Sequence, residues 1–133
     1  MKIITAILLF ATLTFLPWTA FGQSGKSVSV QIHTEKKVAN AGIRIKFVEM
    51  VEDSRCPTGT TCIWAGSAKV KIEVRNGRGP AQTFELNTGI SPSVAKFGGY
   101  DIRLMGLTPK PAVNIRINRN GYVATFEVAK TKK

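Results

Sequence analysis

The segment Lys69-Val70-Lys71-Ile72-Glu73-Val74-Arg75 places an apolar side chain at every second position and a charged one between them. Because successive side chains of a β-strand point to opposite faces, this alternation predicts a strand with one buried face and one exposed face. The same period of two recurs in six further segments: 28–32, 43–47, 84–86, 100–104, 113–117 and 122–128. About seven short strands of this kind predict an all-β fold, an antiparallel β-sandwich of the immunoglobulin-like type, with a small β-barrel as the alternative.

A turn signal supports the last two of these segments as a hairpin. Asn120-Gly121 suits a two-residue type I′ turn, because both central residues of that turn need a positive φ. A turn there would pair 113–117 with 122–128 and would set Ile115 opposite Phe126, apolar against apolar. The sequence therefore predicts that these two segments are neighbours in one sheet.

Two other irregularities carry structural predictions. The alternation slips after Phe47, which a β-bulge would explain. A second Asn-Gly pair at Asn76-Gly77 favours a hairpin, and a three-residue loop through Arg78 would set Val70 against Phe84.

The first residues have the layout of a secretory signal peptide. Met1-Lys2 is a short positive start, Ile3 to Leu16 is apolar apart from three threonines, and Ala20-Phe21-Gly22 supplies small residues before a cut at Gln23. The apolar core runs about 14 residues, whereas a membrane-spanning helix needs about 20. We therefore expect a signal peptide over residues 1–22, a single β-sandwich domain over residues 23–133, and a periplasmic or secreted location with no later transmembrane segment.

The charge balance indicates what kind of partner to expect. The chain has 19 Lys and Arg against 8 Asp and Glu, a net charge of +11, and removal of Lys2 with the signal peptide leaves +10. A strongly basic surface attracts anionic partners. After export, an anionic envelope component or a protein partner is a better expectation than nucleic acid. By strand parity, the candidate basic surface comprises Arg44, Lys46, Lys69, Lys71, Arg103 and Arg116.

The most informative segment is Asp53-Ser54-Arg55-Cys56-Pro57-Thr58-Gly59-Thr60-Thr61-Cys62-Ile63-Trp64-Ala65-Gly66. In an oxidising compartment two cysteines six positions apart are expected to form a disulfide, Cys56 to Cys62. Trp64 is separated from Val70 by an even number of positions, so in a continuous strand both side chains would point to the same face. We therefore expect Trp64 to lie against the core. A tethered loop can also present contacts at low entropic cost. The candidate recognition residues are Asp53, Arg55, Pro57, Thr58, Gly59 and Trp64.

This segment resembles one found in uncharacterised small exported bacterial proteins that form a domain of unknown function. The similar pattern is Asp-Ser-Arg-Cys-Pro, four residues, Cys, one residue, then Trp-Ala-Gly, here within 53–66. The stretch Gly99 to Leu104, with Pro109 after it, and the final 122–128 are similar as well. The resemblance implies an exported β-rich domain and implies no activity.

The sequence lacks the parts of most enzyme classes. The single histidine, His33, falls on a polar strand face, and no nucleophile elbow or phosphate-binding glycine loop occurs. We therefore assign no catalytic residue, metal site or cofactor, and expect a non-enzymatic binding or accessory module of the envelope. The alternatives are an envelope enzyme or cation-binding protein that uses the carboxylates of Glu49, Glu52 and Asp53, or a protease inhibitor that presents Arg55.

Overall fold

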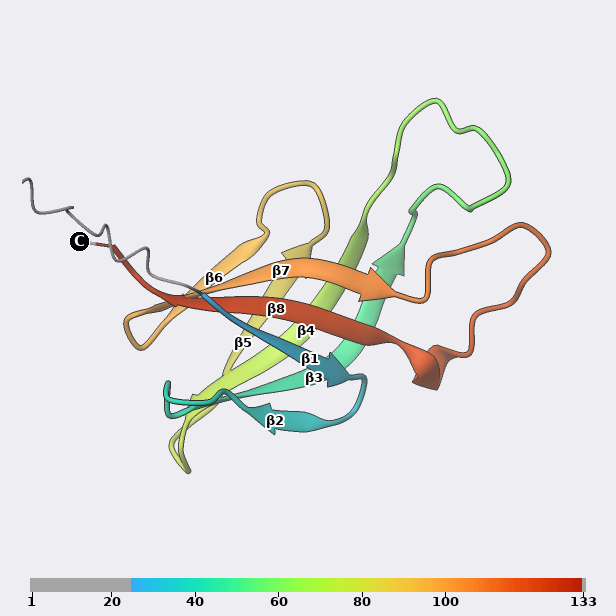
Figure 1. Cartoon of the computed structure of the whole chain (residues 1–133). Helices are drawn as coiled ribbons and strands as arrows, with labels where there is room; N and C mark the ends of the chain where they lie inside the picture. Colours follow the sequence, from blue (N-terminus) through green and yellow to red (C-terminus); the bar gives the residue numbers. More distant parts are fainter. Residues whose placement is uncertain (1–24, 133) are drawn as a thin grey trace, which may run out of the picture.

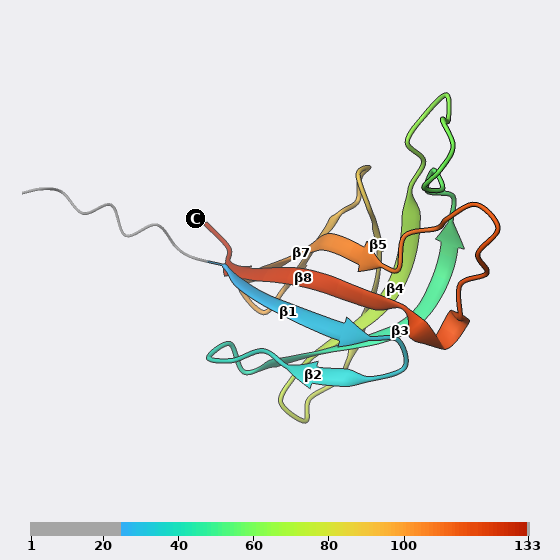
Figure 2. The same cartoon turned by 45° about the vertical axis from the view of Figure 1, so that its right-hand side comes forward.

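The computed structural model describes residues 25–132, which form two four-stranded antiparallel sheets stacked as a sandwich (Figures 1 and 2). One sheet has the strand order β1-β8-β7-β6 and the other has the order β2-β3-β4-β5. The expected β-sandwich is confirmed, with eight strands where the sequence indicated about seven. The strands are β1 Lys26–Gln31, β2 Glu35–Lys37, β3 Ile43–Asp53, β4 Ala68–Asn76, β5 Gln82–Asn87, β6 Val94–Phe97, β7 Tyr100–Thr108 and β8 Val123–Lys130. The expected signal peptide, 1–22, lies outside the described residues.

The core lies between the two sheets and is built from the alternating apolar positions. Along β4, Val70, Ile72 and Val74 are fully buried, while the charged residues between them face outward. The two largest fully buried side chains are Phe47 of β3 and Phe126 of β8, one from each sheet. Burial of this apolar surface is the main force that stabilises the fold.

Two bulges in β3 position the candidate site. The pairing of β3 with β4 shifts once between Phe47 and Glu49, as predicted, and again between Met50 and Glu52. Each bulge adds one residue to β3 and so changes the face on which the following residues lie. After the second shift Asp53 is paired with Ala68, which is buried. The carboxylate of Asp53 is therefore brought to the inner side of the sheet, at the end of the sandwich.

The predicted hairpin of 113–117 with 122–128 is wrong. The last strand, β8, pairs with β7 instead, so that Phe126 faces Leu104 rather than Ile115. The apolar residues of β7 alternate in the same way as those of 113–117. The pattern therefore could not indicate which of the two pairs with β8. Asn120-Gly121 lies in a short 3-10 helix, η1 (Arg119–Gly121), in which the side chain of Asn118 accepts a hydrogen bond from the backbone N–H of Asn120.

The hairpin at Asn76-Gly77 has the predicted phase but a different register. Ile72, not Val70, faces Phe84, which places Val70 opposite Leu86. Pro80 has no N–H to donate to the ladder, and β5 begins only at Gln82. The connection is therefore two residues longer than predicted, which shifts the register without changing the inward face.

Candidate functional site

Three loops meet at one end of the sandwich, which we call the loop end. They are 54–67 between β3 and β4, 88–93 between β5 and β6, and 109–122 between β7 and β8. Figures 1 and 2 both show the first and the third of these loops projecting side by side beyond the strands. The first loop contains most of the residues that the sequence singled out.

The loop 54–67 is closed at its base and cross-linked near its middle. Cys56 and Cys62 form the predicted disulfide. At the base, the N–H of Cys56 donates to the carbonyl of Ala65 at 2.9 Å, and the N–H of Ser54 donates to the carbonyl of Ser67 at 2.8 Å. The projection is therefore a pinned hairpin-like loop rather than a free coil.

Backbone hydrogen bonds also join this loop to 109–122. The N–H of Thr58 donates to the carbonyl of Pro111 at 2.8 Å, and the N–H of Val113 donates to the carbonyl of Thr58 at 3.1 Å. The two loops, far apart in sequence, therefore form one projecting unit.

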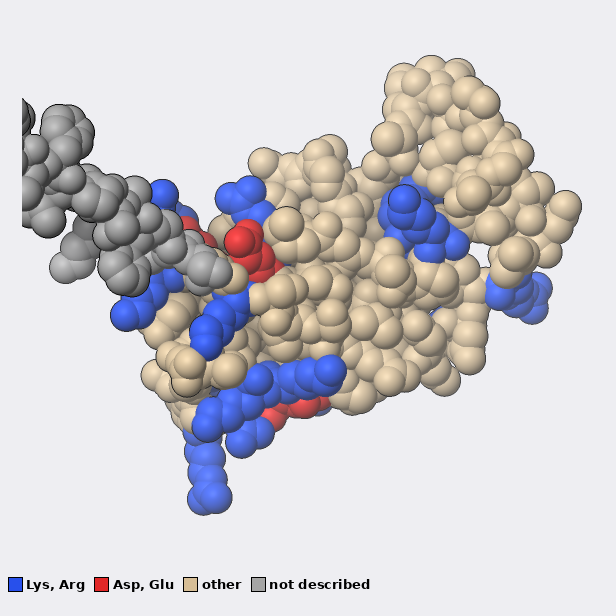
Figure 3. Space-filling view, in the orientation of Figure 1, with Lys and Arg blue, Asp and Glu red and all other residues tan. Residues whose placement is uncertain are grey.

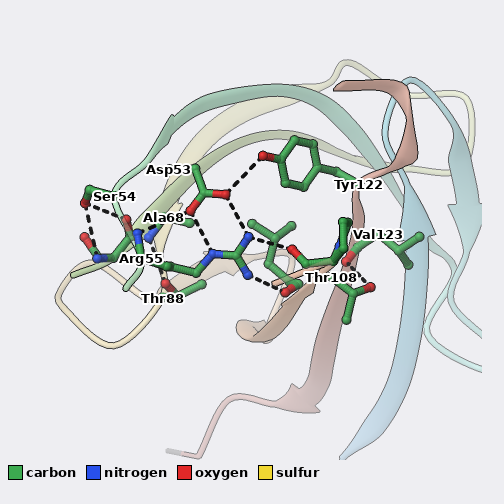
Figure 4. Close-up of polar contacts among 11 residues, drawn as sticks. Asp53, Ser54, Arg55, Ala68, Thr88, Thr108, Tyr122 and Val123 are labelled. Carbon is green, nitrogen blue, oxygen red and sulfur yellow. Dashed lines mark hydrogen bonds and ion pairs between the residues drawn. The ribbon is translucent and has the colours of Figure 1, made fainter. Parts of the chain in front are cut away.

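An ion pair below the loops holds three strands together (Figure 4). The Nε and Nη2 atoms of Arg55 donate to the two carboxylate oxygens of Asp53 at 2.8 and 2.7 Å. The guanidinium also donates to the carbonyls of Leu107 and Pro109 at 2.6 and 2.8 Å, and the hydroxyl of Tyr122 donates to Asp53 at 3.0 Å. This network connects the ends of β3 and β7 with the residue that precedes β8.

The network shifts two pKa values. Burial acts to raise the pKa of Asp53, but the hydrogen bonds and charge of Arg55, together with the hydroxyl of Tyr122, outweigh burial and hold that pKa below its usual range. Burial, and then the hydrogen bond to Asp53, raises the pKa of Tyr122. Asp53 is therefore an ionised partner of Arg55 at neutral pH, with little tendency to accept a proton.

Two expectations for this segment are wrong. Arg55 is not presented to solvent: its side chain is only 13% exposed and is held by the network, so it cannot enter the specificity pocket of a trypsin-like protease. Trp64 does not lie against the core: it is 79% exposed. The strand alternation that predicted its burial applies only from Ala68, where β4 begins.

The other candidate recognition residues lie in the same loop. Pro57 is half-buried, whereas Thr58 and Gly59 are exposed, with Thr58 fixed through its backbone to the neighbouring loop. A side chain at Gly59 would approach Val113 of that loop. The structure therefore brings Thr58, Gly59 and Trp64 to the projecting unit, while Asp53 and Arg55 lie beneath it.

The exposed large apolar side chains of the described residues gather at the loop end. Five of the seven lie on the three loops, and the other two lie near the ends of β3 and β7 that lead into them. Ile63 and Ile115 are 93% and 69% exposed. The full set is Ile63, Trp64, Ile90, Val113 and Ile115 on the loops, with Val51 and Met105 on the strands. Val113 and Ile115 were not expected in this set, because the alternation of 113–117 predicts a strand with these two side chains buried.

The candidate basic residues do not form one surface. Arg44, Lys46, Lys69 and Lys71 lie on β3 and β4, and all but Arg44 lie opposite an acidic residue of the neighbouring strand. Arg44 pairs with Glu35 at 3.1 Å, and Lys71 pairs with Glu49 at 3.1 Å.

The two remaining candidates lie elsewhere. Arg103 is on β7 in the other sheet, opposite Glu127, and Arg116 is in the loop 109–122. Figure 3 shows Lys and Arg as separate groups, several of them beside acidic residues. The alternation along each strand had indicated which basic residues face outward, but it could not indicate which acidic residues lie beside them.

A cleft of about 580 Å³ lies beside the loop end, and it contains the carboxylates that the sequence singled out. Glu49, Glu52 and Asp53 line it together with His33, Arg119 and other residues. Asp53 is held by Arg55, and Glu49 is paired with Lys71. Among residues 25–132, no group of three or more His, Cys, Asp or Glu side chains could hold a metal ion.

Comparison with protein-family models, with curated proteins and with solved structures yields no match. The resemblance to exported bacterial proteins therefore stays a prediction. Within the described part of the chain, no helix is long and apolar enough to cross a membrane.

Removal of the disulfide should destabilise the protein modestly. In the chain-entropy model, a cross-link between Cys56 and Cys62 is worth about 2 kcal/mol, because the closed loop is short. We expect the Cys56→Ser/Cys62→Ser variant to lose about that much free energy of unfolding in urea titrations. Mass analysis of the unreduced wild type should show the two cysteines joined. Free thiols in the exported protein, or a double variant as stable as wild type, would contradict this assignment.

Proposed function

We propose that this protein is an exported, non-enzymatic binding or accessory module of the bacterial envelope, with the loop end as its recognition surface. The observation that carries the proposal is the concentration of exposed apolar side chains on the three loops. Contiguous exposed apolar groups are uncommon on monomeric proteins away from interaction sites. Export is supported by the N-terminal pattern and is consistent with the disulfide.

The construction of the loops supports a recognition role. The disulfide, the cross-loop hydrogen bonds and the Asp53–Arg55 pair hold the projecting unit in one conformation. A surface that is rigid before binding loses less entropy when it binds. Arg55 thus acts as a positioning residue rather than as a contact.

The charge of the loops indicates an anionic partner. Residues 54–72 and 102–126 contain no Asp or Glu. The loop 109–122 carries the exposed cations Lys110, Arg116 and Arg119. Their own loop contains no acidic residue, although Arg119 also lines the cleft that contains Glu49 and Glu52. The basic character therefore matters for binding mainly at the loop end.

The cleft gives weaker support to the alternative of an envelope enzyme or cation-binding protein. It gathers His33, Glu49 and Glu52, which could act in acid–base chemistry. The cation-binding version has less support, because no group of three or more such side chains among residues 25–132 is placed to hold a metal ion. However, Asp53 and Glu49 already have basic partners, and the exposed apolar loops have no role in that reading.

A binding assay with envelope fractions tests the proposal. We expect the wild type, processed to begin at Gln23, to sediment with envelope material, and we expect the Ile63→Ser/Ile115→Ser variant to lose most of that binding. The comparison variant is Val51→Ser/Met105→Ser, which makes the same kind of change on β3 and β7 behind the loops and should weaken binding less. Equal binding by the loop variant and the wild type, or equal losses in the two variants, would contradict a recognition surface on the loops.

A further inference from the structure

We infer that the loop end binds an anionic lipid surface, with Ile63 and Trp64 inserted among the lipids and with Lys110, Arg116 and Arg119 at the level of the phosphate groups. This inference rests on the proposed function and adds the class of partner. It is supported by the shape of the projection, the chemistry of its tip and the distribution of charge around it.

The shape favours a soft surface over a protein partner. The loop 54–67 projects beyond the strand ends and forms the protruding lobe at the upper right of Figure 3. Ile63 and Trp64, at 93% and 79% exposed, have little of the protein around them. A stable protein interface buries about 800 Å² on each partner in a well-packed patch. A narrow tip offers a protein partner less contact area than a flat face does, but lipid can surround such a tip on all sides.

The chemistry of the tip suits the membrane interface. Tryptophan concentrates there, because its ring is largely apolar and its N–H can reach water or headgroups. An isoleucine beside it adds apolar surface that gains free energy on leaving water. The backbone of the projecting loop is partly satisfied, since the N–H of Cys56 bonds to Ala65 at its base and Thr58 bonds to both Pro111 and Val113. These bonds reduce the penalty for taking peptide groups out of water.

The charge distribution orients the molecule on such a surface. In the view of Figure 3, the projecting lobe shows Lys and Arg near its base and no Asp or Glu. Cations close to an anionic bilayer each contribute attraction, whereas carboxylates there would be repelled. Glu52, which has no ion pair among the described residues, lies in the cleft at the end of β3. We therefore expect insertion to stop at the loops and not to reach the strands.

Trp64 provides the readout. The chain has two tryptophans, Trp18 and Trp64, so a chain that begins at Gln23 retains Trp64 alone. All eight strands lie within that chain. We expect vesicles of mixed phosphatidylglycerol and phosphatidylcholine to bind it at low salt, to shift the emission of Trp64 to shorter wavelength, and to expose Trp64 to quenching by brominated acyl chains. Pure phosphatidylcholine vesicles should bind far less.

Three variants separate insertion from attraction. Ile63→Ser/Ile115→Ser, which keeps Trp64 as the reporter, should weaken vesicle binding about tenfold or more. Lys110→Gln/Arg116→Gln/Arg119→Gln should weaken it on the order of a hundredfold at low salt and should flatten its salt dependence. The charge-matched control, Lys36→Gln/Lys37→Gln/Lys96→Gln, removes three exposed cations outside the loop end and should change binding only slightly.

Two results would overturn the inference. Binding to anionic vesicles without a change in Trp64 emission or quenching would mean that the tip does not insert. Absence of binding at low salt would mean that the surface recognised is not lipid. In that case, loss of envelope binding by Ile63→Ser/Ile115→Ser would leave the proposed function standing with another anionic partner, whereas retained envelope binding would remove both.

Discussion

Asp53→Asn should lower the free energy of unfolding by about 3 kcal/mol. The side chains of Asp53 and Arg55 are 12% and 13% exposed, so removal of the carboxylate charge leaves a guanidinium largely shielded from water. Asparagine is nearly isosteric, but it replaces one of two acceptor oxygens with an N–H₂ group that faces other donors. Arg55 and Tyr122 both donate to Asp53, so at least one of these bonds must be lost.

The pH dependence of stability gives this prediction a signature that a packing defect would not share. The pKa of Asp53 is lowered in the folded protein, so the unfolded chain takes up a proton at higher pH than the folded one. The contribution of ionised Asp53 is therefore complete above about pH 5 and is lost as the pH falls through the usual aspartate pKa of about 3.9 and then through the lowered folded value. In Asp53→Asn the part of the acid-induced loss of stability that comes from protonation of Asp53 should be absent.

Urea unfolding at several pH values would measure both effects. The stability of Asp53→Asn should still fall somewhat toward acid pH. The reason is that the hydrogen bond and charge of Arg75, followed by those of Arg44, lower the pKa of Glu35 as well. The control is Lys71→Gln, which breaks the more exposed pair with Glu49 and should cost less than about 1 kcal/mol. A variant Asp53→Asn with wild-type stability and an unchanged pH profile would mean that the network does not stabilise the loop end.

The strands could be predicted from sequence because their physical determinants are local. In β4 and β8 the inner face is buried and the outer face is only half-buried, so apolar and polar residues alternate in segments such as Val70 to Val74. The bulge after Phe47 could also be predicted, since one extra residue must reverse the alternation. These predictions need no knowledge of which strand lies beside which.

Strand pairing could not be predicted in the same way. The apolar positions of β7 and the segment 113–117 have the same period, so either could have paired with β8. The Asn-Gly signal favoured the closer segment, but Asn118 and Asn120 form a short helical turn instead. Because of this error, the exposed apolar residues of the loop end could not be predicted: the wrong pairing placed Val113 and Ile115 in the core, where they do not lie.

The expected positions of Arg55 and Trp64 were wrong for a related reason: Arg55 is shielded from solvent and Trp64 is exposed. Parity is informative only within a strand, and the loop between β3 and β4 has its own conformation. The partners of Arg55 are carbonyls at 107 and 109, about fifty positions away, which no local pattern indicates. The disulfide was predictable, in contrast, because it depends on compartment and spacing alone.

Gly66→Ala should be the most damaging single substitution in the loop and should lower the free energy of unfolding by about 3 kcal/mol or more. Gly66 has a φ of +67°, which costs an alanine about 1 kcal/mol. In addition, a Cβ atom there would overlap the carbonyl oxygen of Ser54 and would lie 2.7 Å from its carbonyl carbon. These neighbours are backbone, so relief requires the base of the loop to open.

Gly77→Ala separates the two contributions. Gly77 also has a positive φ, +56°, but a Cβ there would meet nothing within 4 Å, so that variant should lose only about 1 kcal/mol. The difference between the two variants measures the clash alone. Opening the base would break the bonds from Cys56 to Ala65 and from Ser54 to Ser67, and would free Trp64 from its fixed position. We therefore expect Gly66→Ala, but not Gly77→Ala, to weaken vesicle binding under conditions where both variants remain folded; equal losses of stability in the two would show that the loop base can adjust.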